Sequence, residues 1–66
     1  MAREQDIMHD TPAGHYVYAE RQSYTVYKPQ GFASVTDSAY AKTPDGLSIA
    51  IARCNYLAAW TKPRQP

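Results

Sequence analysis

The side chains best suited to metal binding or nucleophilic chemistry in this chain are His9, Asp10, His15 and Cys54. They show no paired spacing of the Cys-x-x-Cys or His-x-x-x-His kind, which places two ligands on one metal ion. A cysteine nucleophile needs an exposed thiolate beside a base, and the sequence puts no such base next to Cys54. The sequence therefore predicts a protein that is not an enzyme and that holds no metal or other cofactor.

The unusual feature of the composition is its aromatic content: six tyrosines, one tryptophan and one phenylalanine among 66 residues. Tyrosine offers a large apolar area at low rotamer cost and carries a polar hydroxyl at its tip, which suits it to protein interfaces. Aromatic rings on a sheet can also stack on nucleic-acid bases. The elements that position these rings decide which surface they form.

Two segments rich in Tyr, Val and Thr, residues 15–20 and 23–28, predict a pair of strands joined by a short turn at Arg21 and Gln22. The run Pro29-Gln30-Gly31 predicts a second turn. Residues 32–35 then predict a third strand, which could extend to Thr36. Residues 37–42 could prolong that strand, form one helical turn or run as a loop, and we expect a loop.

Residues 47–60 are rich in Ala and Leu and contain no Gly or Pro, so they predict a helix. Thr43 offers an N-cap before Pro44 at the first helical position. Asp45 as the N-cap, with Ser48 three residues later, is the alternative start of this helix.

These elements predict one α+β domain: a three-stranded antiparallel meander with one C-terminal helix packed on one face. We expect this domain to span residues 15–60. Residues 1–14 have few large apolar groups and end in the turn-forming run Asp-Thr-Pro-Ala-Gly, while residues 61–66 contain two prolines. We expect both end segments to be flexible tails.

Pairing the strands about the predicted turns sorts their side chains by face. It places Val17 opposite Val26, and Val26 opposite Ala33, on a small aliphatic face that suits a helix. The helix carries a matching apolar stripe. Its members are Leu47, Ala50, Ile51, Cys54, Leu57 and Ala58.

Two aromatic surfaces then remain outside the predicted core. One is the outer sheet face, and the other is a second helix stripe that begins at Ile49. Large uncovered apolar patches usually mark contact surfaces. We therefore expect the partner-binding residues to be Tyr16, Tyr18, Tyr27 and Phe32 on the sheet, and Arg53, Tyr56 and Trp60 on the helix.

The expected function is that of a small non-enzymatic protein-interaction module, of inhibitor or adaptor type. Its partner would be another protein or a second copy of the chain, which would make a homodimer about a two-fold axis. The alternative is a single-stranded nucleic-acid-binding module that uses the same tyrosines as a stacking platform. Nothing in the sequence indicates a small-molecule substrate.

Charge and cysteine content bear on the cellular compartment and on the class of partner. Seven basic and six acidic side chains give a formal charge of +1, which is not typical of a protein held mainly by phosphates. One cysteine cannot form an internal disulfide. No apolar run is long enough to span a membrane, and the charged N-terminus does not resemble a secretory signal. We therefore expect a cytoplasmic protein that does not associate with membranes.

Overall fold

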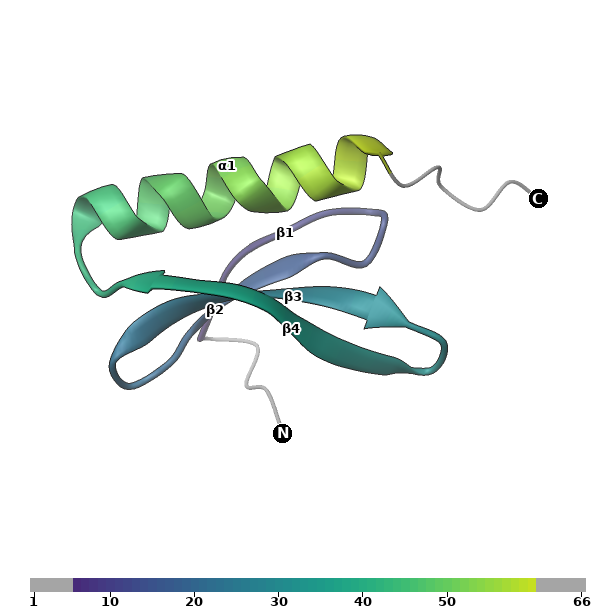
Figure 1. The fold of residues 1–66 in the computed structure, drawn as a ribbon, viewed down its shortest axis with the longest axis horizontal. Helices are drawn as coiled ribbons and strands as arrows, with labels where there is room; N and C mark the ends of the chain where they lie inside the picture. The colour runs from purple at the N-terminus through teal and green to yellow at the C-terminus, as the bar shows by residue number, and fades with distance from the viewer. Residues whose placement is uncertain (1–5, 61–66) are drawn as a thin grey trace.

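The computed structural model of the chain describes residues 6–60 and consists of an antiparallel sheet with one helix on one of its faces (Figure 1). The strands lie in the sheet in chain order, β1-β2-β3-β4. The helix packs mainly over β3 and β4 and less over β2. The elements are β1 (Ile7–Asp10), β2 (Tyr16–Ala19), β3 (Ser23–Gln30), β4 (Ala33–Ala41) and α1 (Pro44–Trp60).

The α+β class, the antiparallel sheet and the C-terminal helix are as predicted, but the sheet has four strands rather than three. The additional strand, β1, lies within residues 1–14, which we expected to form a tail. It pairs with β2 through a register that shifts between Ile7 and His9. Residues 1–5 of the expected N-terminal tail, and all of residues 61–66, lie outside the described residues.

The run Asp-Thr-Pro-Ala-Gly, predicted to end the tail, leads instead from β1 through a turn into β2. The amide of Gly14 donates to the carbonyl of Thr11 at 3.0 Å, and the amide of Thr11 donates to the carbonyl of His15 at 2.9 Å. Gly14 has φ 98°, a backbone conformation that residues other than glycine rarely adopt. Thr-Pro-Ala-Gly therefore closes a hairpin instead of ending a disordered segment.

The register between β2 and β3 is the predicted one. Val17 pairs with Val26, and Ala19 pairs with Tyr24. The turn at Arg21 and Gln22 is closed by a 2.8 Å hydrogen bond from the Glu20 amide to the Ser23 carbonyl. Sorting of side chains between the two faces thus predicted this pairing correctly, even though the turn lacks glycine.

The register between β3 and β4 differs from the prediction. Val26 pairs with Ser38 rather than Ala33, because the turn lies at Gly31 and Phe32 instead of Pro29 and Gln30. Gly31 has φ 64°, which a tight two-residue hairpin turn requires. Pro29 belongs to β3 and pairs with β4 alone, beyond the last residue pair of β2 with β3, so its missing N–H is tolerated there.

The expected loop at residues 37–42 is also wrong, since β4 continues to Ala41. A bulge absorbs one extra residue: Val26 pairs with Ser38, whereas the next residue, Tyr27, pairs with Thr36. Asp37 is the residue left between these two pairs. Its side chain is 9% exposed and forms an ion pair with Arg53 of α1, a contact that no local sequence signal indicates.

Helix α1 begins at Pro44, and Thr43 is its N-cap. The Thr43 hydroxyl accepts a 3.0 Å hydrogen bond from the Gly46 amide, and the Thr43 carbonyl accepts one of 2.9 Å from the Leu47 amide. The predicted cap is confirmed, and the competing start at Asp45 is not used. The predicted apolar stripe is buried or half-buried against the sheet, with Leu47, Ala50, Ile51, Cys54 and Leu57 all at the core.

The core itself is small. Val17, Val26, Ala50 and Cys54 are fully buried, and larger side chains close its rim. The rim residues are Tyr24, Tyr40, Leu47, Ile51 and Leu57. This core occupies one face of the sheet and one face of the helix, so the outer faces of the sheet and of the helix are not part of it.

Candidate interaction surfaces

The outer face of the sheet carries a cluster of three rings, Tyr16, Tyr18 and Tyr27, which we call the tyrosine cluster. Tyr16 pairs directly with Tyr27 across β2 and β3, and Tyr18 follows two residues later on the same face of β2. The rings of Tyr16 and Tyr27 stack with centroids 5.1 Å apart, and Tyr18 meets Tyr27 edge-on at 6.4 Å. Both geometries are favourable for aromatic pairs.

One hydroxyl of the cluster is fixed by an acidic side chain. The Tyr27 hydroxyl donates a 2.6 Å hydrogen bond to Oε1 of Glu20. This bond to the Glu20 carboxylate, together with burial, raises the pKa of the Tyr27 phenol above 10.0. Tyr27 is therefore neutral at physiological pH, and the cluster carries a carboxylate at its margin.

The cluster is less exposed than the sequence led us to expect. All three rings are half-buried, and Thr25 on the same face is 5% exposed. Thr25 shares a 3.0 Å hydrogen bond with Ser23. The rings thus cover one another and the neighbouring Thr25, and each ring displays only part of its surface.

Phe32 does not join this cluster. It lies in the turn between β3 and β4, five residues after Tyr27, with its side chain fully exposed. Its predicted place on a third strand of the outer face was a consequence of the wrong turn position. Phe32 is a separate exposed ring at one end of the sheet.

The outer face of α1 carries the largest exposed apolar side chains of any element in the described chain, and we call it the helix patch: Ile49, Ala52, Tyr56, Ala59 and Trp60. Ile49 is 53% exposed, Tyr56 52% and Trp60 74%. Tyr56 and Trp60 contact each other edge to face at 6.0 Å. The two alanines between the large residues are exposed as well.

Arg53 flanks the helix patch but is held by the sheet. Its Nε donates to Oδ2 of Asp37 at 2.9 Å, and its Nη2 donates to Oδ1 at 3.3 Å. The guanidinium carbon also lies 5.6 Å from the Tyr56 ring centroid. The bond to Arg53 lowers the pKa of the Asp37 carboxyl, and the pKa of Arg53 is raised in turn. Arg53 therefore links the two layers and borders the patch.

The cations that could have flanked the tyrosine cluster are engaged elsewhere or face the other way. Lys42 donates a 2.6 Å hydrogen bond to the Glu20 carbonyl and lies 5.3 Å from the ring centroid of Tyr24, a residue of the helix-facing side. Lys28 alternates with Tyr27 along β3 and so faces the helix. Arg21, in the β2–β3 turn, is exposed and makes no cation–π contact with the rings of the cluster that would hold it beside them.

The candidate ligands for metal or nucleophilic chemistry form no group of three in residues 6–60 that could hold a metal ion. Cys54 is fully buried, and burial raises the pKa of its thiol, to which the nearby Asp10 carboxylate also contributes. His9 donates from Nε2 to Oδ1 of Asn55 at 2.7 Å.

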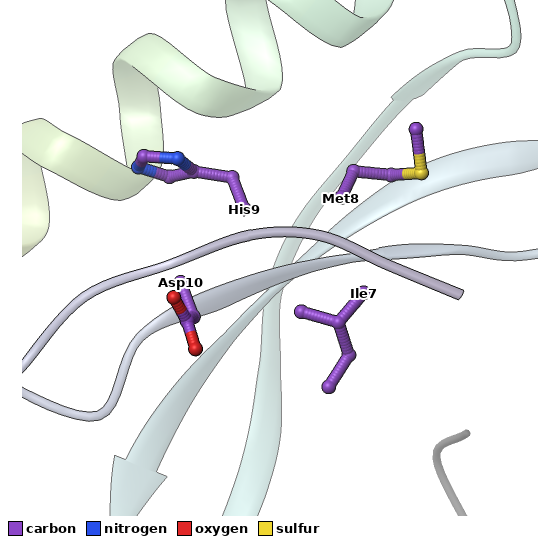
Figure 2. A pocket seen from close by; sticks show the side chains of 4 residues that line it. All are labelled: Ile7, Met8, His9 and Asp10. Carbon is purple, nitrogen blue, oxygen red and sulfur yellow. The ribbon is translucent and has the colours of Figure 1, made fainter. Parts of the chain in front are cut away.

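A hollow of about 230 Å³ is lined by the four residues of β1. Figure 2 shows His9 directed toward the helix and Ile7 directed to the opposite side of the strand. Its lining therefore combines side chains from both faces of an edge strand. No convergent set of polar groups points into one enclosed space there.

No protein-family model, curated protein or solved structure matches this chain. Among residues 6–60, no helix has the length and apolar character needed to cross a membrane.

Proposed function

We propose that this chain is a small non-enzymatic interaction module that binds another protein chain through its aromatic surfaces. The observation that carries the proposal is the helix patch, where two large aromatic side chains and an isoleucine are exposed together on one face of α1. Scattered exposed apolar residues are normal on proteins, but a contiguous group usually marks a contact surface.

The size of the helix patch supports this function. An aromatic side chain buries about 150–250 Å² when covered, so Tyr56 and Trp60 at their exposures display on the order of 250 Å². Ile49 and the two alanines bring the patch to roughly 400–500 Å², the size of the largest patch on a typical monomer. Tyr and Trp are also the side chains most often found as anchors of interfaces.

The tyrosine cluster is the second surface of the module. Its rings are already ordered by stacking and by the Tyr27–Glu20 hydrogen bond, so binding there costs little additional side-chain entropy. An inhibitor would use either surface to occlude a partner, and an adaptor would use both surfaces to bridge two partners. The single unpaired cysteine is consistent with action in the cytoplasm.

Binding of single-stranded nucleic acid is the less supported alternative. A stacking platform needs cations beside its rings to hold the phosphates. Here a carboxylate, Glu20, adjoins Tyr27, while Lys42 is bonded to the Glu20 carbonyl. The rings of Tyr16 and Tyr27 also stack on each other, so one face of each ring is already occupied.

The test is affinity capture with the purified full chain, in four forms. The wild type is compared with Tyr56→Ser/Trp60→Ser, with Tyr16→Ser, and with Gln22→Ser at an exposed turn as the matched control. We expect the control to retain every specific partner protein and the helix-patch variant to lose at least one. Circular dichroism of each variant verifies that it folds.

A fluorescence titration with a labelled single-stranded oligonucleotide provides the second arm. Tight binding that weakens steeply with salt and disappears in Tyr16→Ser would establish the nucleic-acid alternative instead. Equal capture of all partners by the wild type and both surface variants would refute the aromatic surfaces as binding sites.

A further inference from the structure

We infer that the occupant of the helix patch is a second copy of this chain, with the two α1 helices packed antiparallel about a two-fold axis. This inference rests on the proposed function only in taking the patch as a contact surface. It commits to a partner and to a geometry, both of which follow from the spacing, size and charge of the residues on the outer face of α1.

The first observation is spacing. Ile49, Ala52, Tyr56 and Ala59 are all exposed and follow one another at intervals of three, four and three residues. This is the a–d–a–d spacing of a helix–helix seam, in which side chains of one helix insert between those of the other. The inward stripe of α1 is separate from it and is already packed on the sheet.

The second observation is the alternation of size along this seam, which favours an antiparallel pair. Full overlap of two antiparallel seams places Ile49 against Ala59 of the other copy, and Tyr56 against Ala52 of the other copy. Each large side chain then meets a small one, as close packing requires. A parallel pair would instead stack Tyr56 on Tyr56 and leave the alanines facing each other.

The third observation is charge. Arg53 is the only cation of α1, and its charge is neutralised by Asp37 within the same copy. Asp45, in the first turn of the helix, is its only anion. A parallel pair would bring the two Asp45 carboxylates side by side, whereas the antiparallel pair separates them to opposite ends. The helix dipoles are also opposed only in the antiparallel pair.

Another route to a dimer, edge-to-edge pairing of strands, is discouraged at β4. A bulge interrupts this edge strand, and Asp37 points inward from it to Arg53. Bulges and inward-pointing charges are two of the devices by which proteins prevent pairing between edge strands. The helix patch is therefore the better place for self-association than the long edge of the sheet.

The area available predicts a weak dimer. Two patches of roughly 400–500 Å² bury on the order of 800–1,000 Å² in total, which is just below the range of stable specific interfaces, about 1,200–2,000 Å². The dissociation constant should then be in the micromolar range or weaker, so the measurement must cover high protein concentrations.

The experiment is sedimentation velocity of the full chain over a concentration series. It is combined with the emission of Trp60, the single tryptophan. We expect a mass that rises toward twice 7.4 kDa and a blue shift of the emission with concentration. Ala52→Glu should raise the dissociation constant at least about tenfold, because it buries an unpaired charge in the seam. Gln22→Glu, which adds the same charge at an exposed turn, should leave the dissociation constant unchanged.

Crosslinking determines the orientation. In the antiparallel pair, equivalent residues 52 are offset by about four residues, or ~6 Å along the axis, and equivalent residues 59 by about ten, or ~15 Å. A short thiol crosslinker should therefore join copies of Ala52→Cys but not of Ala59→Cys. The native Cys54 is fully buried, so the wild type serves as the unreactive control.

A chain that stays monomeric at every concentration would overturn the inference, and so would a dimer that Ala52→Glu does not weaken. Equal crosslinking of both cysteine variants would overturn the antiparallel geometry. The proposed function can survive the failure of this inference. If the chain is a monomer that captures a different protein through Tyr56 and Trp60, the proposed function holds and the second copy is excluded as the partner.

Discussion

Gly46 allows the first turn of α1 to approach the end of β4 closely, and its replacement by alanine provides a test in which even the sign of the effect is informative. Gly46 is buried in the first turn of α1, and a Cβ atom built on it would overlap the carbonyl oxygen of Ala41 at the end of β4. That oxygen belongs to the backbone, so it cannot move aside as a flexible side chain would. The helix or the end of the strand must shift instead.

Two effects of opposite sign act on the Gly46→Ala variant. Alanine in place of glycine within a helix stabilises a protein by about 0.5–1 kcal/mol when nothing obstructs it. Overpacking of a buried position costs about 1–3 kcal/mol, and a backbone obstacle belongs in the upper part of that range. The net expectation is a loss of about 1–2 kcal/mol. A domain of 66 residues has only about 3–10 kcal/mol in total.

The assay is thermal and urea unfolding followed by circular dichroism. At about 4–8 °C per kcal/mol for a domain of this size, Gly46→Ala should lower the Tm by roughly 4–16 °C. Ser48→Ala is the matched control, because it introduces the same residue at an exposed position of the same helix and should stabilise by a few tenths of a kcal/mol. If Gly46→Ala were as stable as the wild type, the close approach of α1 to β4 would be wrong.

Three further variants or measurements test individual contacts. Asp37→Asn should make the free energy of unfolding less dependent on pH in the acid range. The pKa of the Asp37 carboxyl is lowered from 3.8 in the native protein, so the ionised carboxylate stabilises the fold above that pH, and this stabilisation is lost as the pH falls. Urea unfolding at pH 7 and at about pH 2.5 should show a smaller difference for the variant than for the wild type. Thr43→Ala should cost about 1 kcal/mol by removing the N-cap bond to Gly46, and Thr43→Ser should restore most of that loss. Cys54 should react slowly with a thiol reagent in the native protein and rapidly in denaturant, and fast native reaction would contradict its burial.

The parts of the fold that the sequence predicts correctly are those specified by local patterns. The N-cap at Thr43 and the inward stripe of α1 follow from short-range signals, and both are present. The pairing of Val17 with Val26 follows from the sorting of side chains about one turn. In each case the deciding residues are close together in the chain, so propensity and periodicity are sufficient.

The wrong β3–β4 register came from a local error, the placement of the turn at Pro29 and Gln30, but the other two misses depend on contacts between distant residues. Strand β1 has no strand-like composition, and its place comes from pairing with β2 and from the bond between His9 and Asn55, 46 residues apart. The continuation of β4 past Asp37 comes from its pairing with β3, and Asp37 itself is bonded to Arg53, 16 residues away. Neither contact leaves a mark in the local sequence.

The binding surfaces show the same division. The exposure of Tyr56 and Trp60 follows from helical periodicity and is observed. Strand alternation correctly placed the three tyrosines on one face, but it could not indicate that their rings would cover one another. Exposure of a side chain depends on its neighbours in space, which an alternating pattern does not specify.

The distribution of charge on α1 gives the strongest physical reason to expect a partner at the helix. A surface helix usually carries charged side chains on its solvent side, which keeps that side hydrated. This helix of 17 residues has two charged side chains, and the more central of them, Arg53, is bonded to the sheet through Asp37. Its solvent side beyond the first turn is left with Ser, Ile, Ala, Asn, Tyr and Trp, all exposed. An uncharged outer face of this kind is typical of a helix that lies between two layers, and the described chain supplies only one of them.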